Sequence, residues 1–325
     1  MKIIYMGTPL FAVPSLERLV ESSHKVALVV TQPDRKVGRG QKMQAPPVKK
    51  FAEEKGIEVI QPKSIRTDEF LETIKDIAPD AIVVAAYGKI LPESVLEAPR
   101  LGCINVHASL LPRYRGAAPV NWAIINGETE TGVTIMKMDK GMDTGDIIAR
   151  ESTEILEDDD AQSVTQMLSV LGADLLVKCL DKIEQDDAIE SRPQDDSQAT
   201  YAPMLSKEDG EIDWSQSTEK IICRVRGVYP WPGAYTTRNG ENLKIRRVEP
   251  VWHTLAEEIE KPEQYEPGTV IYLDKAQGFV VKTGDGLVMV TEAQPPGKRA
   301  LSGRDMINGK LIAKGDKLGA PTPPE

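Results

Sequence analysis

The stretch that decides the fold runs from residue 102 to residue 116 and reads GCINVHASLLPRYRG. Its first half is typical of the end of a buried strand, with Ile104 and Val106 pointing to one face. Asn105 and His107 then point to the other face, because side chains alternate along a strand. Two polar side chains therefore emerge side by side at a strand's carboxyl end, which is where open α/β sheets place their ligand crevice.

An amide beside an imidazole is a pair that suits acyl transfer. The amide donates hydrogen bonds to a developing oxyanion, and the imidazole exchanges protons with a nucleophile or an intermediate. Alone, an Asn-x-His pair is more often a satisfied polar pair at a strand end. Here the pair is followed at once by a loop bounded by Pro and Gly that carries Arg113 and Arg115, and this context favours chemistry.

A third polar group is expected from a turn later in the chain. Gly141 and Gly145 bracket Asp143 directly after a β-branched strand, a pattern that suits a tight turn presenting one carboxylate. Such turns are common for structural reasons alone. Given Asn105 and His107 elsewhere in the chain, Asp143 is a candidate partner for the imidazole.

The first thirty residues indicate a parallel sheet. An apolar strand at Lys2–Met6, a helix with an apolar face and a second strand at Val26–Val30 form a β-α-β unit. The intervening Gly7-Thr8-Pro9 turn lacks the G-x-G-x-x-G fingerprint, which argues against a nicotinamide cofactor. The fully apolar run Ala81–Ala86 is typical of a central strand. We therefore expect an α/β fold with a Rossmann-like, mostly parallel open sheet.

The character of the chain changes after Ser206. Several short alternating segments with glycine turns and no intervening helices predict a second, smaller β-barrel domain that resembles the oligonucleotide-binding (OB) type. We expect a catalytic domain over residues 1–189, a linker over 190–205 and the barrel over 206–325.

Two groups of basic residues are candidates for binding a polyanion. The loop at residues 32–42 carries Arg39 between two glycines and ends at Lys42, and it suits contacts to phosphates or base edges, although a charge run is usually a solvated surface. The predicted barrel carries Lys244, Arg246 and Arg247, which form one basic face or are scattered surface cations.

The overall acidity does not exclude such a partner. The 325-residue chain has a formal charge of −10, whereas residues 151–204 alone hold 14 acidic and 3 basic residues, so the remainder is about neutral. Three dispersed cysteines and three dispersed histidines predict a reduced, cytoplasmic protein without a metal site. The apolar run Ala81–Tyr87 is too short to span a bilayer, so we expect no membrane partner.

Together, Asn105, His107, the Ser109–Gly116 run and Asp143-Thr144-Gly145 resemble the formyltransferase family that uses 10-formyltetrahydrofolate. The resemblance covers nearly the whole chain, including Gly7-Thr8-Pro9 and Trp231-Pro232-Gly233-Ala234. Members share a Rossmann-like amino-terminal domain, and those that act on tRNA add a barrel-like carboxyl-terminal domain.

The resemblance implies the roles of the candidate residues. Asn105 and His107 would stabilise the tetrahedral oxyanion and handle the proton of the attacking amine, with Asp143 orienting the imidazole. The folate would lie against Ser109, Leu110, Leu111 and Pro112. The acceptor would be the α-amino group of initiator methionyl-tRNA, bound by a monomeric protein through Arg39, Lys42, Lys244, Arg246 and Arg247.

Three alternatives share parts of this pattern. A formyltransferase acting on a nucleotide-linked amino sugar would have the same catalytic set but would not need the basic loop and barrel. A hydrolase that gives the formyl group to water would need no second domain. A non-catalytic RNA-binding protein would release no folate when mixed with formylfolate and a free amine.

Overall fold

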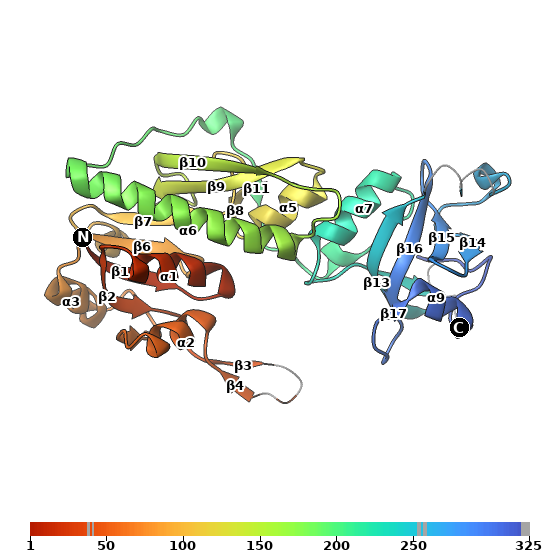
Figure 1. The fold of residues 1–325 in the computed structure, drawn as a ribbon, viewed down its shortest axis with the longest axis horizontal. Coiled ribbons are helices and arrows are strands. Elements are labelled where there is room, and N and C mark those ends of the chain that lie inside the picture. Colours follow the sequence, from red (N-terminus) through yellow and green to blue (C-terminus); the bar gives the residue numbers. More distant parts are fainter. Residues whose placement is uncertain (38–39, 41, 252–254, 256–258, 320–325) are drawn as a thin grey trace. The chain divides into compact units, whose positions relative to one another are not determined.

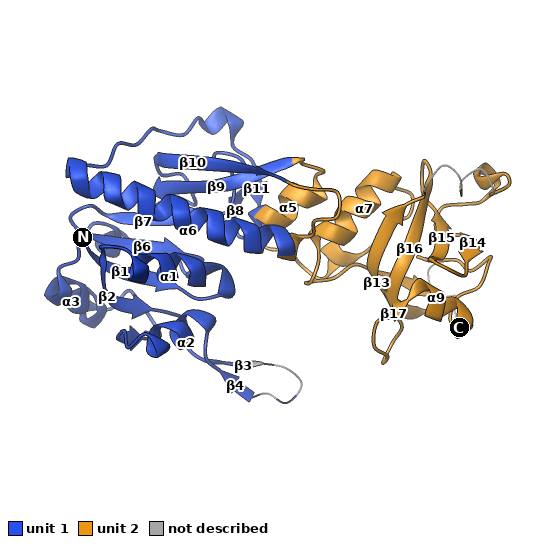
Figure 2. Cartoon of the chain, in the orientation of Figure 1, with its two compact units in different colours: residues 1–119, 130–154, 163–203 blue, residues 120–129, 155–162, 204–325 orange. Residues whose placement is uncertain are grey.

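The computed structural model describes residues 1–37, 40, 42–251, 255 and 259–319. Its chain forms two compact units, each assembled from separate segments (Figure 2). Unit 1 consists of Met1–Pro119, Glu130–Glu154 and Ser163–Pro203. Unit 2 consists of Val120–Thr129, Ile155–Gln162 and the chain from Met204 onward. Residues 190–203, part of the expected linker, thus pack with unit 1.

Unit 1 is built on a seven-stranded sheet with the order β10-β9-β7-β6-β1-β2-β5 (Figure 1). The five strands from β7 to β5 are parallel, and β9 and β10 add an antiparallel edge. This mixed, mostly parallel sheet confirms the predicted fold class. The strands are β1 (Lys2–Gly7), β2 (Lys25–Val30), β5 (Val59–Ile60), β6 (Ala81–Ala85), β7 (Cys103–His107), β9 (Glu130–Lys137) and β10 (Ile147–Glu154).

Helices cover both faces of this sheet. They are α1 (Val13–Glu21), α2 (Pro47–Glu54), α3 (Asp68–Ile77), α4 (Glu93–Leu96) and the long α6 (Ala161–Asp186). Local sequence fixes their ends: α3 begins where the Thr67 hydroxyl accepts from the Phe70 N–H, and it stops at Ala78 in a left-handed conformation with φ 44°.

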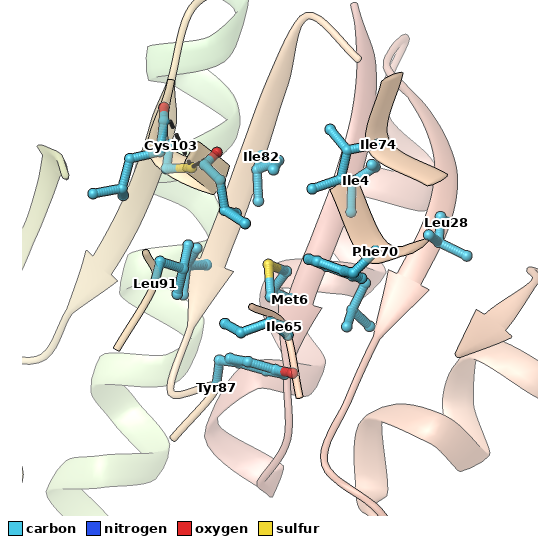
Figure 3. Close-up of a cluster of buried hydrophobic side chains, with 14 residues drawn as sticks. Ile4, Met6, Leu28, Ile65, Phe70, Ile74, Ile82, Tyr87, Leu91 and Cys103 are labelled. Atoms are coloured by element: carbon cyan, nitrogen blue, oxygen red, sulfur yellow. Dashed lines mark hydrogen bonds between the residues drawn. The ribbon is translucent and has the colours of Figure 1, made fainter. Parts of the chain in front are cut away.

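One face of the sheet holds the apolar core shown in Figure 3. Met6 of β1, Ile82 of β6 and Cys103 of β7 belong to one buried cluster that also contains Phe70 and Ile74 of α3. Asn105 follows two residues after Cys103 and pairs with Val84 of this cluster, so it lies on the same face. Asn105 and His107 therefore lie on the same face of the sheet as this apolar core, just beyond its last residue on β7.

The opposite face of β7 is covered by α6. Gly172 of α6 lies so close that an added Cβ would stand 2.8 Å from Cγ1 of Val106 and 3.1 Å from Cγ1 of Val133. Among the described residues α6 is the one helix long and apolar enough to cross a membrane. Val164, Leu168 and Leu176 are completely buried, so α6 is a core helix.

Unit 2 is built on an antiparallel sheet with the order β12-β13-β16-β15-β14, and β17 pairs with β16. The chain segment around Lys317 bridges its two edges: Leu318 pairs with Arg238 of β12, and Lys317 pairs with Thr269 just before β14. The sheet thereby closes into the predicted small barrel. Its strands are β12 (Tyr235–Arg238), β13 (Glu241–Pro250), β14 (Val270–Asp274), β15 (Gly278–Lys282), β16 (Leu287–Gln294) and β17 (Leu301–Ser302), with helices α5 (Pro119–Ile125), α7 (Thr218–Gly227) and α9 (Gly303–Asn308).

The close approach of α6 to β7 predicts the sign of one substitution. In an ordinary helix, replacing Gly by Ala stabilises by about 1 kcal/mol. We expect Gly172→Ala instead to lower the free energy of unfolding by about 1–3 kcal/mol, because the methyl group would collide with Val106 and Val133. Urea unfolding measures the difference. Val170→Ala, at a position of the same helix that is 46% exposed, is the control and should stay within about 0.5 kcal/mol; a stabilised Gly172→Ala would contradict the tight packing.

Candidate active site

His107 is the last residue of β7, and its ring has an oxygen on each side. Nε2 lies 3.1 Å from the backbone carbonyl of Tyr114. Because a carbonyl can only accept, Nε2 is the donor in this hydrogen bond. Nδ1 lies 3.6 Å from Oδ1 of Asp143, and the imidazole is only 7% exposed. The sequence-predicted pairing of His107 with Asp143 is therefore present in the geometry.

Asn105 lies on the same face of β7, two residues before His107, and is 9% exposed. Within the described part of the chain, its side-chain amide makes no hydrogen bond to another residue. A nearly buried amide with unused donors beside an imidazole fits the role of an oxyanion donor.

Asp143 is held in a strained turn between β9 and β10. Its φ of 55° lies in the left-handed region, which residues other than glycine seldom adopt. Its Oδ2 accepts a hydrogen bond of 2.9 Å from the Gly116 N–H, which leaves Oδ1 toward His107. The turn itself is organised by Asp139, whose carboxylate accepts from the Gly141 N–H at 2.9 Å and the Thr144 hydroxyl at 2.7 Å.

The loop after β7 is fastened to the sheet by Thr134 of β9, the residue paired with His107. The Thr134 hydroxyl donates to the Ser109 carbonyl at 2.6 Å and accepts from the Leu111 N–H at 3.1 Å. The Ser109 hydroxyl donates to the Arg113 carbonyl at 2.6 Å. The Ser109 hydroxyl and the backbone N–H of Leu111 therefore hold the loop's shape.

The expected folate residues thus differ in their exposure. Ser109 is 1% exposed, Leu111 is completely buried and Pro112 is buried as well. Leu110 is half-buried, so among these four residues it is the one whose side chain reaches the protein surface.

A group of residues that the sequence analysis missed surrounds the Asp143 turn. Gln194 donates to the carbonyls of Asp143 and Gly145, and it accepts from the buried Arg115. The Thr200 hydroxyl accepts from the Tyr114 N–H at 2.8 Å. These residues come from the stretch interpreted as a linker, and a polar run such as Gln194–Gln198 gives no local signal that separates a linker from a segment packed on a site.

The predicted basic residues lie on separate elements. Lys42 is exposed on β4 (Lys42–Gln44), which pairs with β3 (Arg35–Val37), whereas Arg39 lies outside the described residues. In β13 an irregularity at Arg246 and Arg247 breaks the alternation, because Ile245 and Val248 on either side are both buried. Arg247 is consequently exposed, whereas Arg246 is half-buried and its Nε is completely buried.

The three basic residues of β13 differ in their surroundings. Lys244 is exposed, Arg246 donates to Oε1 of Gln294 at 2.6 Å, and Arg247 has its Nε 3.9 Å from Oε1 of Glu249. Arg246 and Arg247 also line a groove of about 1280 Å³ within unit 2. Acidic side chains, among them Glu219 and Glu292, line the same groove, so its charge is mixed.

Cys103, Cys179 and His24 lie outside the site and are structural, whereas His253 lies outside the described residues. Burial raises the pKa of the Cys103 thiol to about 12 and that of Cys179 to about 11, so neither is a thiolate at neutral pH. His24 lies between Asp181 and Glu184, and its pKa is lowered mainly by burial. No group of three or more His, Cys, Asp or Glu side chains that would hold a metal ion occurs in the described ranges.

Residues 1–180 match the family model described as formyl transferase, and residues 204–311 match the one described as formyl transferase, C-terminal domain. The chain therefore belongs to the formyl transferase family and is an enzyme. Methionyl-tRNA formyltransferases from Geobacter metallireducens and Caldanaerobacter subterraneus are 50% and 49% identical to it over 319 residues, which are 98% of this chain and 99% and 100% of theirs. Within that family the chain belongs with the methionyl-tRNA formyltransferases.

Two solved structures share its fold at lower identity. HypX from Aquifex aeolicus, solved with tetrahydrofolic acid, has a TM-score of 0.65 at 18% identity, covering 97% of this chain and 48% of that one. An N-formyltransferase from Helicobacter canadensis, solved with folinic acid and dTDP-3-aminofucose, has a TM-score of 0.65 at 21% identity, covering 89% and 98%.

Thr134 gives a test of how the loop is held. We expect Thr134→Val to lower the free energy of unfolding by about 1–3 kcal/mol, because it leaves the Ser109 carbonyl and the Leu111 N–H buried without their partner. Chemical denaturation measures the change. Thr153→Val on the neighbouring β10 is the control, since its hydroxyl makes only a 3.5 Å contact to the Met167 sulfur; equal losses in the two variants would contradict the role given to Thr134.

Proposed function

We propose that Asn105, His107 and Asp143 transfer the formyl group of 10-formyltetrahydrofolate to the α-amino group of initiator methionyl-tRNA, for translation initiation. The observation that carries this proposal is the placement of an imidazole between a carbonyl and a carboxylate, with an unused amide beside it, in a chain of this family. Acyl transfer needs an oxyanion donor and a proton acceptor, and these side chains supply both.

The proposed reaction balances without any further reactant. The neutral amine attacks the formyl carbon and forms a tetrahedral intermediate, whose oxyanion accepts from the Asn105 amide. Because Nε2 of His107 already carries a proton, Nδ1 takes the proton that the amine nitrogen loses, and the Asp143 carboxylate beside Nδ1 stabilises the resulting imidazolium. The bond between the formyl carbon and folate N10 then breaks, and the imidazolium gives that proton to N10 as tetrahydrofolate leaves.

We place the folate along Ser109–Pro112, next to the catalytic set. That the ligand is a folate is supported by the two structural neighbours, which were solved with tetrahydrofolic acid and with folinic acid. Because Ser109 and Leu111 are buried, backbone groups and the half-buried Leu110 are the parts of this run that would contact the ligand.

We further propose that tRNA binds through the loop carrying Arg39 and Lys42 and through Lys244, Arg246 and Arg247 of the barrel. Basic side chains position a nucleic acid by its phosphates, and an arginine near bases adds selectivity. The proposed division is a catalytic domain over residues 1–189 and a tRNA-binding domain over 206–325, connected by residues 190–205, of which 190–203 pack with unit 1. Because the proposed acceptor is an aminoacylated tRNA of the cytoplasm, we propose that the enzyme is cytoplasmic.

The amino-sugar alternative draws support from the Helicobacter canadensis neighbour and its dTDP-3-aminofucose. That neighbour is 21% identical to this chain, whereas the methionyl-tRNA formyltransferases reach 50%. Formyl transfer measured in parallel with charged initiator tRNA, charged elongator tRNA and an amino-sugar nucleotide decides the matter. Transfer to the sugar nucleotide but to neither tRNA would refute the proposal.

The catalytic roles predict large rate losses without unfolding. We expect His107→Ala to lower the single-turnover rate by about 10²–10⁴-fold and Asn105→Ala by about 10²–10³-fold. Single-turnover reactions with formylfolate and aminoacylated initiator tRNA, quenched at successive times, measure these rates. Circular dichroism checks the fold. Asn242→Ala, at an exposed position of β13, is the control; near-normal turnover in either site variant would remove the role assigned to it.

Replacing Arg39 should change the selectivity between tRNAs, whereas replacing Lys42 should change the affinity for all tRNAs. We expect Arg39→Ala to reduce transfer to initiator methionyl-tRNA relative to elongator methionyl-tRNA by about 10-fold, within the usual value of a base-reading arginine. Lys42→Ala should weaken both tRNAs evenly and reduce the salt dependence, as loss of a phosphate contact does. Folate binding should be unchanged in both variants. A loss of folate affinity in Arg39→Ala would place the loop at the small-molecule site instead.

A further inference from the structure

We propose that Gln194 is a positioning residue for the transfer reaction, acting through the Asp143 turn. This inference rests on the proposed function of Asn105, His107 and Asp143. Gln194 lies between the stretches 1–180 and 204–311 that the family models match.

The side-chain amide of Gln194 uses its full hydrogen-bonding capacity at this place. Its Nε2 donates to the carbonyl of Asp143 at 2.8 Å and to that of Gly145 at 2.7 Å. Its Oε1 accepts from Nε of Arg115 at 3.1 Å and from Nη2 of Arg115 at 2.8 Å. Only this orientation of the amide satisfies all four contacts, because carbonyls cannot donate and a guanidinium cannot accept.

Arg115 supplies the fixed side of this arrangement. Its side chain is only 3% exposed, and Asp196 accepts from its Nη2 at 2.7 Å. Its backbone is part of β8 (Arg115–Gly116), which pairs with β11 (Tyr201–Ala202), and its N–H donates to the Thr200 carbonyl at 2.8 Å. Gln194 therefore connects the Asp143 turn to a buried charge on a paired strand.

The Asp143 turn needs such a connection because its backbone conformation is unfavourable. A φ of 55° at a residue other than glycine persists only when the surroundings enforce it. Gly116 holds one oxygen of the carboxylate, and Gln194 holds the main chain on either side of Thr144. With both in place, Oδ1 of Asp143 stays 3.6 Å from Nδ1 of His107.

The path of the chain explains how Gln194 reaches the turn. After α6 the chain runs back past the edge strand β10 toward β11 (Figure 1), and Arg192 forms a two-way bridge with Ile147 of β10. Gln194 follows two residues later. The stretch 192–202 therefore packs along the loop after β7 and the Asp143 turn. Gln194 makes its contact with the Asp143 turn.

Replacement of Gln194 by Glu is the sharpest test. Glu keeps the acceptor for Arg115 but loses both donors, and it sets a carboxylate oxygen against two carbonyls. We expect Gln194→Glu and Gln194→Ala to lower kcat for methionyl-tRNA formylation by about 10–100-fold, because misplacement of a catalytic group by about 1 Å has such an effect. The KM values for formylfolate and for tRNA should stay within about twofold.

A matched control and a double-substitution cycle separate positioning from general damage. Gln198→Ala removes an exposed amide of the same segment that donates only to Asp195 at 2.8 Å, and it should leave kcat unchanged. In an Asp143→Ala background, Gln194→Ala should cost less than about twofold more, because Gln194 acts through Asp143. Independent losses that multiply would overturn the proposal.

The outcomes distinguish this inference from the proposed function. A wild-type enzyme that formylates no methionyl-tRNA would refute the function itself. A wild-type enzyme that is active, with full kcat retained in Gln194→Glu, would refute the role of Gln194 alone. Unfolding midpoints are measured for every variant, and Gln194→Met, which keeps the side-chain length without hydrogen bonds, carries the test if Gln194→Ala does not fold.

Discussion

The close contact between Val106 of β7 and Gly172 of α6 is the constraint on which the site depends. Because strand side chains alternate, fixing Val106 against the helix forces Asn105 and His107 to the other face. A shift of one residue in β7 would bury Asn105 and His107 under α6. The pairing of His107 with Thr134 on β9 fixes the same register from the side, and Thr134 also holds the loop that follows.

Much of this arrangement follows from local sequence. The alternation at Ile104–His107, the apolar run of β6 and the glycines around Asp143 predict the sheet, the polar pair and the turn, and the structure brings His107 and Asp143 together. The roles given to the folate and tRNA residues stay predictions. Gln194 and Thr200 escaped prediction because their contacts join residues 51 and 86 positions apart, and nothing in their own sequence differs from that of a linker.

The strained Asp143 turn is held by two segments that are far from it in the sequence. The Asp143 turn has an unfavourable backbone, and its hydrogen bonds come from Gly116 on one side and from Gln194 on the other. Neither segment lies next to the turn in sequence, so the geometry of the carboxylate depends on the complete fold of unit 1. Under the proposed function, Asp143 is thus positioned by residues that have no chemistry of their own.

Several of the acidic residues that make the chain negative are paired with basic side chains nearby. The acidic stretch 151–204 gives the protein its negative charge, yet several of its carboxylates contact cations of unit 1: Asp174 binds Arg18, Asp187 binds Arg100 and Asp196 binds Arg115. The pairs of Arg18 and Arg100 are exposed and stabilise the fold only weakly, whereas Arg115 is buried. All three pairs reduce the field that those carboxylates would otherwise exert on a polyanion. Since opposite charges cancel at short range, the net charge of −10 says little about whether the exposed lysines and arginines of β4 and β13 attract RNA.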